Sequence, residues 1–232
     1  MRQAFERVAS SIAAAFKAGA PSSQELTPPE LIDSIQQLLE LCEQLDREYG
    51  QDKKVIYHDI SLVADHVINA LSDLGIWAES LGLTDEKYSL DQVALQAAQW
   101  ATRHGGIIRS LLPIVNAFAQ RANRTQDKEQ LVTLFHEMRR IIEHTEDSIK
   151  ADTDKLDPAR PWKILNLNYA IVATRTQLPE FMTLAYSDLE LNLPDECPEF
   201  FEEGLKQAEK AVYGPVVKTI MKRYFDKWTT RH

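Results

Sequence analysis

Apolar residues recur at intervals of three and four along most of the chain, which is the period of an α-helix that buries one face. The stretch 28–49 is the clearest case. Thr27 offers a capping hydroxyl, prolines occupy the first turn, and Gly50 follows the last apolar residue. We therefore predict a helix from 28 to 49, with Cys42 in the core, because its apolar stripe is Leu31, Ile35, Leu38, Leu39, Cys42 and Leu45.

The same period predicts further helices downstream. Ser89 and Gln92 form the pattern of a capping box at the start of the helix 89–105. Gly75 could kink or divide the helix 53–81. Pro113 should bend the helix 107–122. The segment 107–122 is apolar on nearly every side, which is typical of a central, buried helix. The helices are expected at residues 53–81, 89–105, 107–122, 127–149, 160–175, 179–192, 196–211 and 215–230.

No segment favours a strand, so the predicted fold class is all-α, with nine to ten antiparallel helices in one bundle-like or short solenoid domain. Residues 1–18 form an N-terminal amphipathic docking helix in this interpretation, although an organelle transit peptide or an interfacial helix has a similar composition. Residues 28–232 form the single all-helical domain, whose part 160–230 has a repeat-like pattern. The sequence has no apolar run of the roughly 18 residues that a membrane span needs.

Two short stretches, 168–173 and 189–194, carry the repeat-like pattern. Small residues in the first and a proline at the end of the second resemble a tetratricopeptide repeat, which recurs about every 34 residues. That interval separates Ala170 from Gly204, so 162–195 and 196–229 are candidate units. Asn166 and Met182 depart from the family pattern, and ordinary helical hairpins are the alternative. The resemblance implies a concave peptide-binding groove faced by Asn168 and Arg175.

Amide side chains in the helix predicted over 160–175 need hydrogen-bond partners, because Asn166 and Asn168 stand among apolar residues. Each could bridge neighbouring helices or line a groove. The candidate partner-binding groove therefore comprises Asn166, Asn168 and Arg175.

Glycine is scarce, with 8 in 232 residues, and none lies between Gly106 and Gly204. The glycine-rich loops of dinucleotide-binding and P-loop proteins are absent, as is the G-x-S-x-G elbow of α/β-hydrolases. Two cysteines without a C-x-x-C pattern favour a reducing compartment, and thus a cytoplasmic location, and argue against structural zinc. No catalytic motif and no cofactor site is recognised, so we interpret the chain as a non-enzyme.

Histidines next to acids suggest the alternative, a helical enzyme or metal-binding protein with a His/Glu/Asp pocket. His58 and His66 form one such set, with Asp59 and Asp65 beside them, and His136 and His144 form another. Residues seven apart on a helix lie about 10.5 Å apart, too far to share one metal ion. Arg139 and Arg140 disfavour a cation at the second set. No metal site is therefore predicted.

Charge is unevenly distributed in a chain whose net charge is −9. Residues 176–205 contain eight acids and no base, whereas 205–232 contain seven bases and two acids. The basic end could pack on the acidic segment or contact an acidic partner or nucleic acid. An acidic protein repels phosphate, which makes nucleic acid the less favoured partner. The aromatics there are expected in the core, because one helical stripe comprises Val217, Ile220, Met221, Tyr224 and Trp228. The candidate contact face is Lys218, Lys222, Arg223 and Lys227.

These features together predict a helical protein–protein interaction or scaffold protein without catalytic activity. Its partner would be another protein or a peptide, with a homodimer as one arrangement. An adaptor or regulator that uses the basic C-terminal helix is the third alternative.

Overall fold

The computed structural model describes residues 1–19, 26–51, 54, 59–153, 155, 159–210 and 213–229. These residues form eleven α-helices, one short 3-10 helix at Pro194–Glu196 and no strand, with one isolated bridge between Ile108 and Thr145. The all-α prediction is confirmed. There is one helix more than expected because the segment 127–149 forms two, α6 (Lys128–His144) and α7 (Asp147–Lys150). No described helix is long and apolar enough to cross a membrane.

Backbone contacts divide the chain into two compact units. The first comprises Met1–Gln120 and Glu143–Asp147, and the second comprises Arg121–Ile142 and Ser148–His232. Each unit has a core of its own. The N-terminal helix belongs to the first unit, and the single domain expected over 28–232 stays a prediction.

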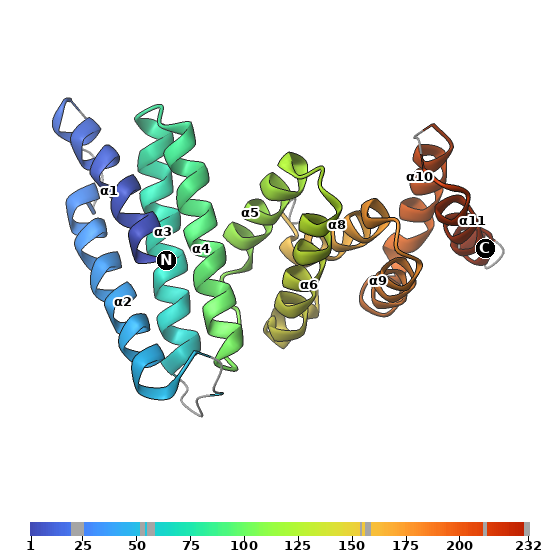
Figure 1. The fold of residues 1–232 in the computed structure, drawn as a ribbon, viewed down its shortest axis with the longest axis horizontal. Coiled ribbons are helices and arrows are strands. Elements are labelled where there is room, and N and C mark those ends of the chain that lie inside the picture. The colour runs from blue at the N-terminus through green and yellow to red at the C-terminus, as the bar shows by residue number, and fades with distance from the viewer. Residues whose placement is uncertain are drawn as a thin grey trace. The chain divides into compact units, whose positions relative to one another are not determined.

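The first unit is built on four long helices, α1 (Arg2–Lys17), α2 (Pro28–Tyr49), α3 (Asp59–Ser80) and α4 (Thr84–Arg103) (Figure 1). Helix α3 packs against α2 and α4, and α1 packs against the same two helices. The predicted helix 28–49 is confirmed, and Cys42 is 0% exposed. At its start, the Thr27 N–H and hydroxyl donate to the Glu30 carboxylate at 2.8 and 2.6 Å.

The structure excludes one of the two roles left open for Gly75 and contradicts the expected helix start at Ser89. Gly75 does not divide the helix that contains it, which runs from Asp59 to Ser80. Helix α4 begins at Thr84 rather than at Ser89, and the Ser89 hydroxyl donates to the Asp85 carbonyl oxygen at 2.9 Å from within the helix. Acidic residues in the first turn of α4 stabilise this earlier start by interacting with the helix dipole.

The helix expected over 107–122 also begins elsewhere, because α5 spans Leu111–Arg124. Pro113 therefore lies in the first turn, where a missing N–H has no helical acceptor to lose, instead of bending the helix interior. The chain before it is extended, and Ile108 exchanges backbone hydrogen bonds with His144 (2.8 Å) and Glu146 (3.0 Å). The segment is not buried on all sides, since Leu112 is 41% exposed.

The second unit contains most of α6 and four further helices, α8 (Pro161–Thr176), α9 (Pro179–Asn192), α10 (Cys197–Lys210) and α11 (Pro215–Thr229). All four match the predicted segments. Helices α8 and α9 pack as one hairpin, α10 and α11 as another, and α11 also contacts α9 (Figure 1).

Aromatic rings fill the core of the second unit. Phe135 of α6 stacks on Tyr169 of α8 and Phe181 of α9, with ring centroids 4.7 and 4.4 Å away. Tyr186, Phe201 and Tyr224 bring α9, α10 and α11 together, with centroids 5.0–5.2 Å apart. The first set of contacts joins α6 to the hairpin of α8 and α9, and the second set joins that hairpin to α10 and α11.

Candidate partner-binding groove

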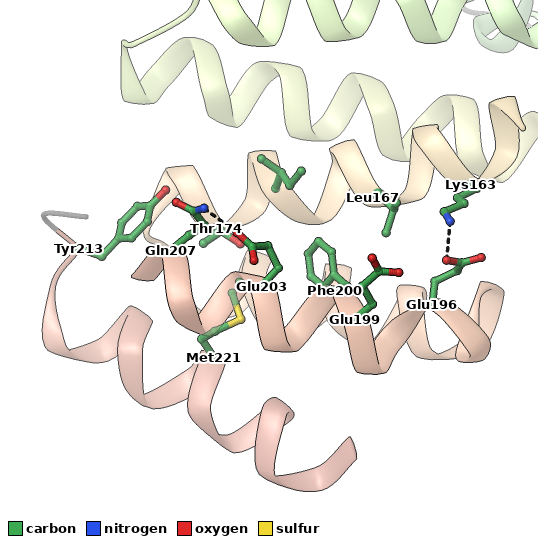
Figure 2. A pocket seen from close by; sticks show the side chains of 12 residues that line it. Lys163, Leu167, Thr174, Glu196, Glu199, Phe200, Glu203, Gln207, Tyr213 and Met221 are labelled. Atoms are coloured by element: carbon green, nitrogen blue, oxygen red, sulfur yellow. Dashed lines mark hydrogen bonds and ion pairs between the residues drawn. The ribbon is translucent and has the colours of Figure 1, made fainter. Parts of the chain in front are cut away.

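A groove with a volume of about 500 Å³ lies between α8 and α10 in the second unit (Figure 2). The α8 side chains that line it stand three or four residues apart and so share one helix face. They are Lys163, Leu167, Ile171 and Thr174; α10 contributes Glu199, Phe200, Glu203, Gly204 and Gln207; and Glu196, Tyr213 and Met221 complete the lining.

Large apolar side chains form the middle of the groove. Leu167 and Ile171 come from α8, Phe200 from α10 and Met221 from α11. Ile171 is 45% exposed, although most large apolar side chains of the described chain are buried. A Cβ added at Gly204 would lie 2.9 Å from the Met221 Sδ, so this glycine leaves room for the Met221 side chain. The groove thus presents an apolar surface to water.

Charged side chains border this surface. Glu196 accepts from Lys163 at 2.6 Å and from Arg160 at 2.8 Å, and Arg160 also pairs with Asp152. Burial opposes ionisation of Glu196, but the hydrogen bonds from Lys163 and Arg160 outweigh it and keep the pKa of Glu196 below its ordinary value. This end of the groove is therefore fixed by an ion-pair network.

Two further acids, Glu199 and Glu203, stand one helical turn apart on α10 and are exposed. Figure 2 shows both extending from α10 toward α8 on either side of Phe200. Glu203 accepts a hydrogen bond from the Gln207 amide at 2.6 Å. Within the described part of the chain, no lysine, arginine or histidine forms an ion pair with either carboxylate. The rim near the apolar surface is consequently negative.

Thr174 anchors the other end of the α8 wall. Its hydroxyl donates to the Ala170 carbonyl oxygen at 2.8 Å and lies 2.6 Å from the Tyr186 hydroxyl, which can donate to it. Burial raises the pKa of Tyr186 well above its ordinary value, so this phenol stays protonated. The wall is thus tied to α9.

The three groove residues expected from the sequence lie elsewhere. Asn166 is 1% exposed; its amide nitrogen donates to the Trp162 carbonyl oxygen at 2.9 Å, and its amide oxygen accepts from Asn192 at 2.8 Å. It bridges α8 and α9, one of the two roles that the sequence left open, and a residue so buried cannot face a partner.

Arg175 and Asn168 are not among the groove-lining side chains either. Arg175 donates to the carbonyl oxygens of Ala122, at 2.7 Å, and Thr125, and so satisfies acceptors at the end of α5. Asn168 is half-buried on α8. The sequence interpretation missed the lining residues, although Leu167 and Ile171 form a second apolar stripe on α8 that could have indicated another covered or partner-binding face.

The basic face on α11 is partly used within the second unit. Lys227 pairs with Glu190 of α9 at 2.6 Å, and the Trp228 indole donates to the same carboxylate at 2.7 Å. Lys222 lies 3.5 Å from Asp226, Arg223 lies over the Tyr224 ring, and Lys218 is half-buried. The basic helix thus packs on the acidic segment. Tyr224 is in the core as expected, whereas Trp228 of the same stripe is only half-buried. Contact of this face with an acidic partner or nucleic acid stays a prediction.

The histidines are dispersed. His66 is exposed in the first unit and His136 is exposed in the second, while His58 lies outside the described residues. No group of three His, Cys, Asp or Glu residues in the described ranges is placed to hold a metal ion. His104 is fully buried, with its Nε2 2.8 Å from the Asp46 carboxylate, which also accepts from the Trp100 indole at 2.9 Å. This cluster joins α2 to α4.

Both cysteines are free and buried. Burial raises the pKa of Cys42 to about 12 and that of Cys197 to about 12. Nucleophilic attack by cysteine requires the thiolate, so neither thiol is activated at neutral pH.

No family model, no curated protein and no solved structure matches this chain. The function is therefore inferred from the geometry and chemistry of the groove.

Proposed function

We propose that the chain is a helical interaction protein that binds a segment of a partner polypeptide in the groove between α8 and α10, without catalysing a reaction. The observation that carries the proposal is the apolar surface of the groove, where Ile171 is 45% exposed beside Leu167 and Phe200. Exposure of this apolar surface to water is unfavourable, and an apolar side chain of a partner would remove the surface from water.

The energetic scale supports binding of moderate affinity. Full burial of one isoleucine, leucine or phenylalanine side chain contributes about 1.5–3 kcal/mol. The loss of translational freedom and the ordering of side chains offset part of this gain. Anchoring on two or three such side chains is therefore sufficient for a reversible complex, which suits an interaction or scaffold protein.

The arrangement of the hairpins also supports the proposal. The walls of the groove come from α8 and α10, the first helices of two successive hairpins. The tetratricopeptide resemblance of residues 162–229 implies a peptide groove faced by successive helical hairpins. We further propose a cytoplasmic setting, because both thiols are free.

Selection from a peptide library tests the proposal. Phage-displayed random peptides of about 16 residues, long enough to cover the groove as a helix, would be selected on the wild-type chain and measured on two variants. Ile171→Asp places a carboxylate in the groove. Leu191→Asp is the matched control, because Leu191 is 81% exposed on α9 and does not line the groove.

We expect selected peptides to bind Ile171→Asp at least about tenfold more weakly than wild type, and Leu191→Asp with unchanged affinity. Circular dichroism should show both variants folded, since both positions are at the surface. A library that yields no enriched peptide, or peptides that bind Ile171→Asp as tightly as wild type, would contradict the proposed function.

A further inference from the structure

We infer that the occupant of the groove is a short, positively charged amphipathic α-helix of a partner protein. This inference rests on the proposed function, because it specifies what the same groove binds. It follows from the backbone chemistry of the walls, the length of the apolar surface and the charge of the rim.

The walls favour a helical occupant over an extended one. Both walls are α-helices, whose backbone N–H and C=O groups bond within each helix, so they cannot pair with the backbone of a bound strand. Several of the polar lining side chains are already bonded within the unit, since Lys163 pairs with Glu196 and Gln207 donates to Glu203. The Thr174 hydroxyl likewise bonds Ala170 and Tyr186. An extended segment would therefore bury unpaired backbone groups, whereas a helix satisfies its own.

The length of the groove sets the length of that helix. The α8 lining runs from Lys163 to Thr174, which at 1.5 Å per residue is about 16 Å, or roughly three helical turns. A helix of this length presents apolar side chains at positions i, i+4 and i+7 on one face. Those side chains would contact Leu167, Ile171 and Phe200.

The rim specifies the charge. Of the charged lining residues, Lys163 and Glu196 pair with each other, whereas Glu199 and Glu203 form no salt bridge in the described ranges. The nearby Lys206 pairs with Glu202 and only adds a coulombic attraction to Glu203. Lysine or arginine side chains beside the apolar stripe of a bound helix would pair with them, and an acidic helix would be repelled. Phosphate groups would be repelled for the same reason, so a nucleic acid does not suit this groove.

Charge reversal on both sides tests the inference. The probes are the selected peptides whose binding depends on Ile171. Each peptide is also made in a version with every lysine and arginine replaced by glutamate. A further version carries a central proline. They would be measured on wild type, on Glu199→Lys/Glu203→Lys, and on Glu180→Lys/Glu209→Lys. The last variant makes the same charge change at exposed residues that do not line the groove.

We expect the selected peptides to be basic and to bind Glu199→Lys/Glu203→Lys at least about tenfold more weakly than the Glu180→Lys/Glu209→Lys control. The glutamate versions should bind Glu199→Lys/Glu203→Lys more tightly than they bind wild type. The proline versions should bind wild type at least about tenfold more weakly, because proline breaks the helix.

Groove-dependent peptides that are neutral or acidic, or that tolerate proline, would overturn the inference and leave the proposed function standing. Equal effects of the two charge-reversed variants would also overturn it, because the rim would then not be the site of recognition. Failure to select any Ile171-dependent peptide would instead reject the proposed function itself.

Discussion

The groove between α8 and α10 contrasts with a hollow of about 370 Å³ between α1 and α4 in the first unit. The hollow is lined mainly by polar side chains such as Arg7, Asp85 and Glu86, and Ser11 donates to Glu86 at 2.7 Å. Water can satisfy such a lining, whereas it cannot satisfy the apolar middle of the groove. The difference teaches that the chemistry of the lining, more than the volume, singles out the groove as the proposed partner site.

One cluster in each unit shows a different kind of contact between helices. In the first unit, Asp46, Trp100 and His104 join α2 to α4 through hydrogen bonds. In the second unit, the rings of Phe135, Tyr169 and Phe181 join α6 to α8 and α9. Substitutions in these two clusters therefore compare a polar with an aromatic contribution to stability.

The largest expected effect is that of Phe135→Ala in the second unit. Removal of a fully buried ring that stacks on Tyr169 and Phe181 should lower the free energy of unfolding by about 3–5 kcal/mol. Gln130→Ala, at an exposed residue of the same helix, should change it by less than about 1 kcal/mol. Urea denaturation followed by circular dichroism measures both, and similar effects of the two variants would refute the aromatic core.

Asp46→Ala should have the next largest effect, in the first unit. It leaves the Trp100 indole and the His104 imidazole without their shared acceptor, which we expect to cost about 2–3 kcal/mol. Asp33→Ala on the same helix is the control, because Asp33 is exposed, and should stay within about 0.5 kcal/mol of wild type. If both variants unfold at the same urea concentration, the cluster does not stabilise the unit.

Two glycines give a smaller, paired prediction. A Cβ at Gly106 would lie 2.8 Å from the Ile60 Cγ2 and 3.1 Å from the Ala101 carbonyl oxygen, so Gly106→Ala should destabilise the first unit by about 1–3 kcal/mol. At Gly204 the close atoms are the flexible end of Met221, and alanine favours the helix by about 1 kcal/mol. Gly204→Ala should therefore change thermal stability little, and a larger loss than in Gly106→Ala would contradict this packing.

The smallest effect should appear at alkaline pH. Burial raises the pKa of Cys42 and of Cys197 from an ordinary 9.0 to about 12. The folded state therefore favours the protonated thiols, and their contribution to stability is fully present below pH 9.0 and declines toward pH 12 as the unfolded thiols ionise. The unfolding free energy of Cys42→Ala/Cys197→Ala should fall less steeply over this range than that of wild type; equal slopes would contradict the assignment.

Helical periodicity and helix-ending residues predicted much of the fold. Residues 28–49 and the four helices of the C-terminal part match, because capping and proline signals there are local. The start of α4 was missed because Ser89 matches a capping pattern inside a helix. The start of α5 was missed because Ile108 forms backbone hydrogen bonds with His144 and Glu146, which are distant in the sequence. This pairing keeps the chain before Leu111 out of the helix and so places Pro113 in the first turn.

The candidate site was less predictable than the fold. The sequence correctly indicated that Asn166 needs partners, but only the packing of α8 on α9 decides that Asn192 satisfies it. The groove depends on residues of α8, α10 and α11 that are far apart in the sequence. Periodicity shows which face of a helix is apolar; it does not show which apolar face another helix leaves uncovered.

Nuclear magnetic resonance tests the central claim most directly. An isotope-labelled chain would be titrated with a basic peptide selected on it, and backbone amide shifts would be followed. We expect the largest shifts along 163–174 of α8 and 199–207 of α10, and small shifts around the polar hollow between α1 and α4. Shifts concentrated in the first unit, with those of α8 and α10 unchanged, would contradict the account.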